Sequence, residues 1–331
     1  MTDVDRQIDS QIDSQTVAIP EDHAGERLDK VLAILFPDYS RSRLQTWLKE
    51  GHILLDGEPV AARTKVLSGQ VLQVSLPERI EVKTIAQPLP LDVLYADDDI
   101  IIINKAAGRV VHPAAGNADG TLQNALLHHF PETAHLPRAG IVHRLDKETT
   151  GVMVVARSER AHKHLVEQLQ DHSMGREYLA LVDGVLVAGS TIETEMGRHP
   201  VDRKRRAVLQ FGGKVAITHY RVEQRLSPYT LLRVSLETGR THQIRVHMAH
   251  IRKPIVGDPL YGGRLKLPKG ASEELKQALR AFPRQALHAE TLHLIHPHTE
   301  AAMHFTVPMP DDMQQLLQCL KAELQNPAYG K

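Results

Sequence analysis

A break that contains three prolines separates two stretches of this sequence with different hydrophobic spacing. The segment PERIEVKTIAQPLP, residues 77–90, shows neither helical nor strand periodicity. Proline lacks a backbone N–H and fixes its φ angle, so this composition is typical of an extended linker. The 331 residues are enough for two domains of ~100–200 residues each. We therefore expect one domain at residues 17–76 and a second at residues 91–325.

The acidic residues gather at the N-terminus. Residues 1–16 contain the near-repeat QIDSQIDSQ, which is polar and lacks aromatic side chains, so we expect a disordered acidic tail. Residues 1–26 hold seven acidic side chains and one arginine, which leaves the rest of the chain with a charge of +6 although the total is zero. A neutral total therefore does not exclude a surface that binds RNA.

Cys319 is the only cysteine in the sequence, so no disulfide forms within the chain, which fits a reducing cytoplasm. No apolar run approaches the ~18–20 residues of a membrane helix. The first residues also lack the basic start and apolar stretch of a signal peptide. We expect a cytoplasmic protein that does not enter a membrane, and a monomer.

The spacing of residues 26–76 predicts two helices followed by a hairpin of short strands. The first helix is indicated by apolar residues at helical spacing, namely Leu28, Val31, Leu32 and Leu35. Ser40 can cap a second helix, which Gly51 ends. Strand-like runs at 53–55 and 71–76 lie around a turn at Asp56 and Gly57.

From residue 91 the pattern is richer in strands. We expect a strand pair at 94–95 and 100–103, helices at 122–129 and 159–171, and further strands at 151–156, 177–182, 216–222 and 231–236. The strands do not alternate regularly with helices. This predicts an α+β domain with a mixed, mostly antiparallel sheet.

The segment GIVHRLDKETTG, residues 140–151, places Asp146 between Arg144 and Lys147 in a polar turn before an apolar strand. On local chemistry alone, Asp146 fits a turn or capping residue. The two cations also favour an ionised carboxylate, which can act as a nucleophile, a base or a metal ligand.

Several segments together resemble one enzyme family. HRLDKETTG resembles the signature HRLDxxTSG of the ribosomal large-subunit pseudouridine synthases, the family that contains synthases A, C and D. NKAAGRVVHP, REYLALV, ETGRTHQIRVHMAHIRKPIVGDPLYGG and RQALHAETLHLIHP follow in the family's order, with Ala106 where the family has proline. RLDKVLAILFPDYSRSRLQTWLKEGHILLDGEPV resembles the S4 RNA-binding domain, apart from Asp56 and Gln70. The resemblance is closest to the D branch.

The resemblance implies a pseudouridine synthase catalytic domain after a small S4-like domain, and it implies roles for individual residues. Asp146 becomes the nucleophile, Arg245 its ion-pair partner, and Tyr178 the side chain that stacks on uracil and takes the C5 proton. Ile244 and His143 join the substrate-binding residues. Arg144 matches an arginine that fills the gap left by an extruded uridine. A phosphate contact or a structural ion pair is the alternative for Arg144.

Basic side chains in two places are candidates for RNA contacts. Arg41 and Arg43 belong to the second expected helix of the S4-like segment. A loop after Arg198 carries the dense basic run Arg203, Lys204, Arg205 and Arg206. Such clusters suit RNA phosphates, although a solvated surface loop has the same composition.

The implied reaction is isomerisation of uridine to pseudouridine, which moves the glycosidic bond from N1 to C5 and gains no atoms. We therefore expect no cofactor. Two histidine clusters, at 242–250 and 288–298, lack the spacing of known metal motifs, so we expect no metal. The expected substrate is 23S rRNA of the large ribosomal subunit, in the helix 69 stem-loop. The alternatives are the same reaction at other rRNA or tRNA sites, an RNA-binding ribosome assembly factor, and a metal-dependent phosphodiesterase.

Overall fold

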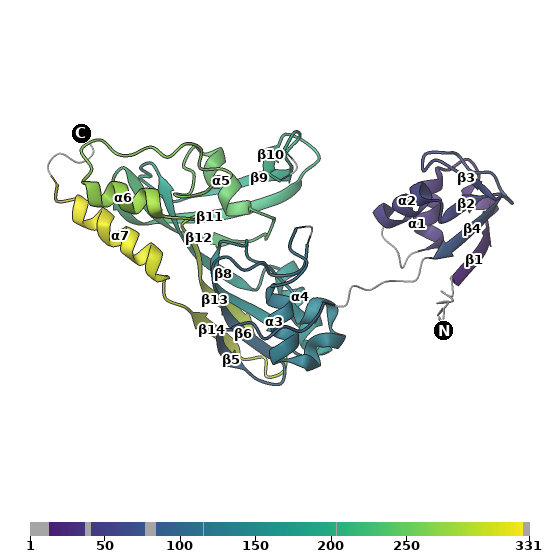
Figure 1. Ribbon diagram of the computed structural model, residues 1–331, viewed down its shortest axis with the longest axis horizontal. Helices are drawn as coiled ribbons and strands as arrows, with labels where there is room; N and C mark the ends of the chain where they lie inside the picture. The colour runs from purple at the N-terminus through teal and green to yellow at the C-terminus, as the bar shows by residue number, and fades with distance from the viewer. Residues whose placement is uncertain (1–12, 37–40, 77–83, 115, 203, 327–331) are drawn as a thin grey trace, which may run out of the picture. The chain divides into compact units, whose positions relative to one another are not determined.

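The computed structural model describes residues 13–36, 41–76, 84–114, 116–202 and 204–326. The chain divides into two compact units, Met1–Lys83 and Thr84–Lys331. Both combine helices with a sheet, which confirms the α+β class (Figure 1). In the described ranges, every helix is too short or too polar to cross a lipid bilayer.

The first unit is a four-stranded sheet with two helices. The strand order is β1-β4-β2-β3, with every neighbouring pair antiparallel. The elements are β1 (Asp13–Ala18), η1 (Glu21–His23), α1 (Leu28–Leu35), α2 (Arg41–Glu50), β2 (Ile53–Leu55), β3 (Glu58–Pro59) and β4 (Val71–Leu76). Leu28, Leu32 and Trp47 of the helices pack against Ile53 and Leu72 of the sheet. The expected helical face and the turn at residues 56–57 are both present.

Part of the expected disordered tail is a strand. Residues 1–12 lie outside the described residues, but β1 begins at Asp13 and pairs with β4 along its whole length. The expectation of disorder for residues 13–16 was therefore wrong. The polar composition of these residues is compatible with an edge strand, because β1 is held by backbone hydrogen bonds to β4 and not by its side chains.

The second unit is built on one sheet of ten strands. The order is β10-β9-β11-β12-β8-β13-β7-β6-β5, and β14 pairs with β13. Only the β13–β7 pair is parallel. The strands are β5 (Val93–Ala96), β6 (Ile100–Lys105), β7 (Thr150–Ala156), β8 (Gly175–Asp183), β9 (Ser190–Arg198), β10 (Arg206–Leu209), β11 (Lys214–Leu226), β12 (Tyr229–Leu236), β13 (Leu287–Ile295) and β14 (Ala302–Thr306). The mixed, mostly antiparallel sheet is as expected.

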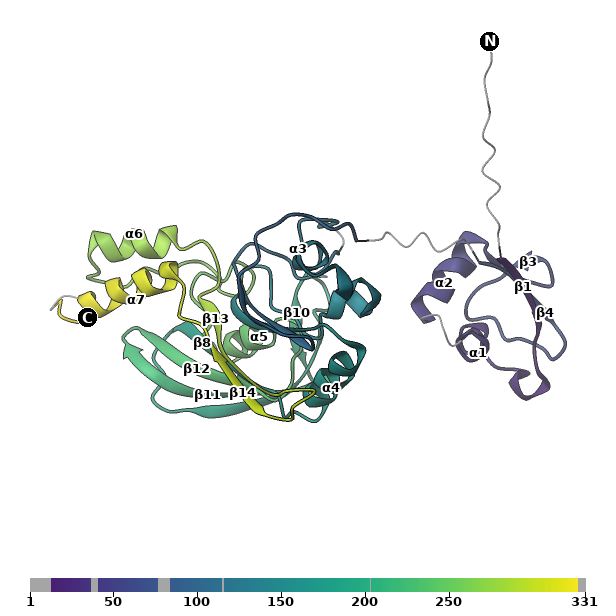
Figure 2. The same ribbon diagram turned by 90° about the horizontal axis from the view of Figure 1, so that it is seen from below.

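Helices pack on this sheet. They are α3 (Leu122–His129), η2 (Pro131–His135), η3 (Pro137–Gly140), α4 (Glu159–Gln170), α5 (Gln243–His250), α6 (Glu273–Ala281) and α7 (Asp311–Glu323). Thr121, Ser158 and Ser272 cap α3, α4 and α6 through their hydroxyl oxygens. Helix α5 contacts β10 and β11, and α6 lies beside α7 (Figures 1 and 2).

Residues 84–90, the end of the expected linker, belong to the second unit. The Asn124 side chain donates to the carbonyl oxygen of Ile85, and the Gln87 side chain accepts from the backbone N–H of Gly120. The Arg109 guanidinium donates to the carbonyl oxygen of Pro90. These bonds hold the segment against α3 and its N-terminal turn although it forms no helix or strand.

Gly151 sits where β7 meets the parallel strand β13. Its φ angle is +124°, and a Cβ atom there would lie 2.1 Å from the carbonyl oxygen of Ala289. We expect Gly151→Ala to lower the free energy of unfolding by about 2–4 kcal/mol. Gly120→Ala is the control, because Gly120 has φ +66° but open space around it. That change should cost only about 1–2 kcal/mol. Equal losses in urea unfolding would contradict the close approach.

His247 of α5 is fully buried between two threonines. Its Nδ1 lies 2.8 Å from the Thr218 hydroxyl and its Nε2 lies 2.9 Å from the Thr194 hydroxyl. Burial lowers the pKa of His247 to about 4, with a smaller effect from His250. His247 therefore takes up a proton near pH ~6.5 in the unfolded chain, but only near pH 4 in the folded chain.

This difference predicts that the free energy of unfolding falls as the pH drops from ~6.5 to ~4, by up to about 1.4 kcal/mol per pH unit from this one group. His247→Gln should lower that slope by the contribution of about one proton bound on unfolding. The matched control is His250→Gln, an exposed position on the same helix. Urea titrations across this pH range measure both slopes, and an unchanged slope for His247→Gln would reject the assignment.

Candidate active site

A pocket with a volume of about 320 Å³ opens in the second unit. This size lies at the lower end of the ~300–1,000 Å³ typical of ligand sites. Its walls come from the loop before β7, the start of β8, and the turn that leads into α5. The lining includes His143, Arg144, Asp146, Tyr178, Ile244 and Arg245, which brings six residues singled out by sequence into one cavity.

Asp146 and Arg245 form an ion pair in this pocket. Arg245 Nη1 donates to Asp146 Oδ2 at 2.9 Å. Arg245 also donates from Nε and Nη2 to the two oxygens of Asp258, at 2.7 and 2.9 Å. Asp258 in turn accepts from the backbone N–H groups of Leu260 and Tyr261. Asp258 therefore binds two nitrogens of the guanidinium, and the third nitrogen binds Asp146.

Burial and charge act in opposite directions on Arg245, whose side chain is 5% exposed. Burial lowers its pKa, but the hydrogen bonds to Asp258 and the negative charges of Asp146 and Asp258 outweigh burial, so the pKa is raised. Arg245 therefore stays a cation. The Asp146 side chain is 16% exposed, which leaves it open to the pocket.

His242 lies on the other side of the Asp146 carboxylate. Its Nε2 is 3.8 Å from Asp146 Oδ1, and its Nδ1 is 2.9 Å from the Tyr261 hydroxyl. That hydroxyl also accepts the backbone N–H of Arg206 at 2.8 Å. Burial lowers the pKa of His242, although the charge of Asp146 opposes this. His242 and the Tyr261 hydroxyl therefore connect the surroundings of Asp146 to the start of β10.

Tyr261 also contacts two guanidinium groups. The Cζ atom of Arg245 is 5.1 Å from the centre of its ring, and that of Arg205 is 5.2 Å away. Both distances fit cation–π contacts. Tyr261 thus joins the basic loop between β9 and β10 to the partner of Asp146.

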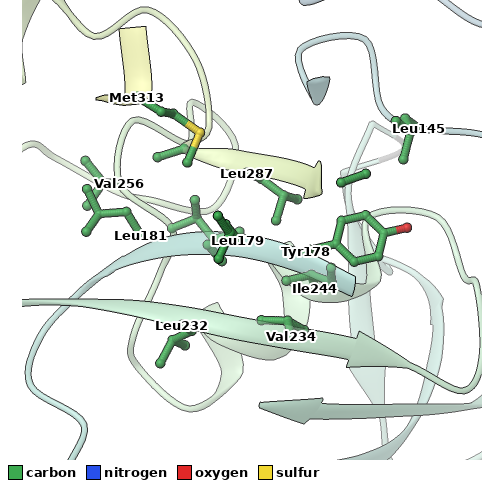
Figure 3. Packing of buried hydrophobic residues seen from close by; sticks show 14 of the residues in the cluster. Leu145, Tyr178, Leu179, Leu181, Leu232, Val234, Ile244, Val256, Leu287 and Met313 are labelled. Carbon is green, nitrogen blue, oxygen red and sulfur yellow. The ribbon is translucent and has the colours of Figure 1, made fainter. Parts of the chain in front are cut away.

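Tyr178 and Ile244 form the apolar wall of the pocket. Tyr178 is 5% and Ile244 4% exposed, and both pack in the main core of the unit. Figure 3 shows the Tyr178 ring beside Leu145 and Ile244, with its hydroxyl pointing away from Leu179 and Leu181. Burial raises the pKa of Tyr178, while the charge of Arg176 opposes this.

Two buried cations hold the loop that carries Asp146. Lys105 Nζ donates to the carbonyl oxygens of Ala106, Arg109 and Lys147 at 2.8–3.0 Å. Arg284 donates to the carbonyl oxygen of Glu148 and is paired through two hydrogen bonds with Asp312. Consecutive carbonyl groups just after Asp146 are therefore fixed by side chains from β6 and from the segment before β13.

Arg144 is exposed at the rim, where its Nη1 lies 3.5 Å from His112 Nε2. His143 points inward and its Nε2 accepts the backbone N–H of Val154 at 3.1 Å. Burial, helped by the charge of Arg176, lowers the pKa of His143 to about 3. His143 is thus a neutral residue that bonds β7 as well as lining the pocket.

The other residues expected to contact RNA differ in their exposure, and some lie outside the described residues. Arg41 and Arg43 lie in α2, but their side chains are outside the described residues, as is the whole of Arg203. Lys204 is exposed, whereas Arg205 and Arg206 are half-buried at Tyr261. Only part of the basic run therefore faces solvent.

The histidines are bonded to other groups. His288 lies 2.9 Å from the Thr150 hydroxyl and 3.2 Å from the carbonyl oxygen of Val307, and His296 pairs with Asp97. Within the described ranges, no three His, Cys, Asp or Glu side chains converge as metal ligands do.

Sequence reasoning missed Asp258, His242, Tyr261, Lys105 and Arg284. Four of them lie inside motifs that were recognised, and Arg284 begins another, but their partners are distant in the chain. One signal was available for Asp258. A buried arginine that pairs with a carboxylate at a pocket needs a second acid to hold it, and the motif offers only Asp258 after Arg245.

Comparisons with known proteins identify the family of both units. Residues 99–250 match the profile of the RNA pseudouridylate synthase family, and residues 26–72 match the S4 domain. Ribosomal large subunit pseudouridine synthase D of Xanthomonas campestris pv. campestris is 52% identical over 305 residues, 92% of this chain and 92% of that protein. The protein of the same name from Escherichia coli K12 is 49% identical over 311 residues, 94% and 95% of the two chains.

A solved structure supports the same class. Human RNA Pseudouridylate Synthase Domain Containing 4 is 25% identical, with a TM-score of 0.56 over 70% of this chain and 93% of that one. The fold is therefore that of an RNA pseudouridine synthase, an isomerase that acts on RNA. Within that class, the chain belongs to the family of the ribosomal large subunit pseudouridine synthases D.

Asp258 should be required for the placement of Arg245. Asp258→Asn keeps its size but turns one acceptor oxygen into an NH₂ group that faces the guanidinium. We expect a loss of about 3–5 kcal/mol in the free energy of unfolding. The isomerisation rate of the folded fraction should fall about 100-fold, because Arg245 no longer holds Asp146 in position. Unaltered stability and rate in single-turnover assays would contradict this role.

Proposed function

We propose that this protein converts specific uridines of 23S rRNA to pseudouridine, with Asp146 as the nucleophile. The observation that carries the proposal is the Asp146 carboxylate, bonded to Arg245 at 2.9 Å and open to a pocket that Tyr178 also lines. The relatives are ribosomal large subunit pseudouridine synthases, which supports large-subunit RNA as the substrate. Within that RNA, we propose the helix 69 stem-loop.

The pocket suits one extruded nucleotide. A uridine within stacked RNA does not expose its glycosidic bond, so the base must leave the stack at a cost of a few kcal/mol. Tyr178 and Ile244 offer apolar surfaces for the base, and the exposed Arg144 at the rim can stack in the gap that it leaves.

The chemistry requires few groups. A carboxylate oxygen of Asp146 adds to C1′ of the ribose as the C1′–N1 bond breaks, or assists departure of the base. The detached uracil turns, its C5 atom bonds to C1′ and releases Asp146, and N1 gains a proton. Tyr178 takes the proton from C5. Atoms are conserved, so the reaction needs neither a redox cofactor nor a donor.

Basic side chains outside the pocket extend the contact to RNA. Lys204 is exposed, and the segments that carry Arg41, Arg43 and Arg203 add further positive charge. Arg205 and Arg206, half-buried beside Tyr261, and His143, which lines the pocket, complete the residues that we propose for RNA binding. We propose that the protein acts as a monomer in the cytoplasm.

The test is release of tritium from C5-labelled uridine in 23S rRNA. We expect Asp146→Asn to lower the single-turnover rate by about 10⁴ or more, because removing a nucleophile removes the covalent route. Asp119→Asn, an exposed aspartate, is the matched control and should retain full activity. Full tritium release by Asp146→Asn would reject the nucleophile, and modification mapped outside 23S rRNA would reject the substrate.

A further inference from the structure

Arg176 is a buried cation that lines the pocket without a carboxylate partner. It lies in β8 two residues before Tyr178, so the two side chains point to the same face of the sheet. Arg176 is 8% exposed. Among the described residues, its guanidinium makes one hydrogen bond, from Nη2 to the carbonyl oxygen of Glu237 at 3.4 Å, and its Nε is buried without an acceptor.

The other buried arginines of this unit are fully paired. Arg245 binds two carboxylates, and Arg284 binds Asp312 and three backbone carbonyl groups. A buried charge without such partners is costly to the folded protein. The contrast indicates that the missing partner of Arg176 is a ligand in the pocket.

The pocket wall leaves space for this guanidinium. Gly239 also lines the pocket, and a Cβ atom there would lie 2.7 Å from Arg176 Nη1. A larger residue at 239 would press on the guanidinium group. The group thus lies beside a backbone wall, next to the cavity.

The depth of Arg176 distinguishes two kinds of ligand group. Arg138, Arg144 and Arg240 line the same pocket but are exposed, as suits phosphates that stay in contact with water. Arg176 is buried beside Tyr178, the side chain assigned to the base. Its partner is therefore a polar group of the base, and uracil offers the carbonyl oxygens O2 and O4.

We propose that Arg176 stabilises the negative charge that develops on uracil as its bond to the ribose breaks. The inference rests on the proposed function. An Asp146 oxygen bonds to C1′ while the C1′–N1 bond breaks, and its electron pair spreads over N1, O2 and O4. Arg176 donates to a carbonyl oxygen that carries this charge. C5 then bonds to C1′ and displaces Asp146, the C5 proton leaves, and N1 gains a proton.

A fixed guanidinium suits this task because it needs no reorganisation when the charge appears. Donors aimed at developing charge in a dry site are among the largest contributions to catalysis. Arg176 would thus be a catalytic residue, since it touches the atoms whose charge changes. The bound uracil supplies Arg176 with a hydrogen-bond acceptor that the free protein does not offer it.

The test compares two substrates under single turnover, with saturating protein and RNA that carries uridine or 5-fluorouridine at the target. Fluorine withdraws electrons and stabilises the uracil anion by itself. We expect Arg176→Gln to slow consumption of uridine about 10- to 100-fold, the usual effect of a hydrogen bond to a charged group. The loss should be several-fold smaller with 5-fluorouridine, and the Kd for RNA should be unchanged.

The charge-conserving variant Arg176→Lys should recover part of the rate with uridine. The same loss with both bases would overturn the proposal, because a structural defect does not respond to the charge on the leaving group. Weaker RNA binding with an unchanged rate would also overturn it, and would make Arg176 a phosphate contact.

Stability gives an independent measure. Because Arg176 is unpaired in the free protein, Arg176→Met should leave the urea midpoint of unfolding unchanged or raise it. A lower midpoint would overturn the proposal in favour of a structural role.

The two proposals fail separately. An inactive Asp146→Asn protein together with a fully active Arg176→Gln protein keeps the nucleophile and rejects the role of Arg176. An active Asp146→Asn protein together with the uridine-selective loss in Arg176→Gln rejects the nucleophile and keeps the charge stabilisation on the base.

Discussion

The ion pair between Asp258 and Arg245 is the constraint on which the rest of the site depends. It orients the guanidinium by two hydrogen bonds and leaves the third nitrogen for Asp146. Helix α5 therefore serves two purposes at once. Its buried face contributes Ile244 and Met248 to the core, and the same burial holds Arg245 where only carboxylates can neutralise it.

Much of the fold could be predicted from local sequence. The helix at 122–129 and the cap at Ser158 follow from apolar spacing and a hydroxyl at the N-terminus. β9, β10, β13, β14 and α6 were not predicted. Several of these strands mix polar and half-buried positions, so their register comes from neighbouring strands and not from an alternation visible in one segment.

The residues of the site were likewise predicted from sequence only in part. Asp146, Tyr178 and Arg245 were found because motifs carry them, and the pocket brings them together. Tyr261 and Lys105 also lie in motifs, but their contacts reach residues that are distant in the sequence. Lys105, for example, donates to the backbone carbonyl oxygen of Lys147, and Tyr261 accepts from the backbone N–H of Arg206. Such contacts depend on tertiary structure, which periodicity does not encode. The sequence likewise identifies Arg176 only as part of the REYLALV motif, since its unsatisfied Nε is a property of the folded pocket.

The anchoring of the loop after Asp146 by Lys105 and Arg284 has a consequence for newly made chains. These anchors come from β6 and from the segment before β13, and Arg284 is held in turn by Asp312 at the start of α7. Asp146 is thus held in this geometry only after nearly the whole second unit has been synthesised and packed. A nascent chain on the ribosome therefore contains Asp146 well before its loop is anchored, because the last of these contacts forms only after synthesis has reached α7.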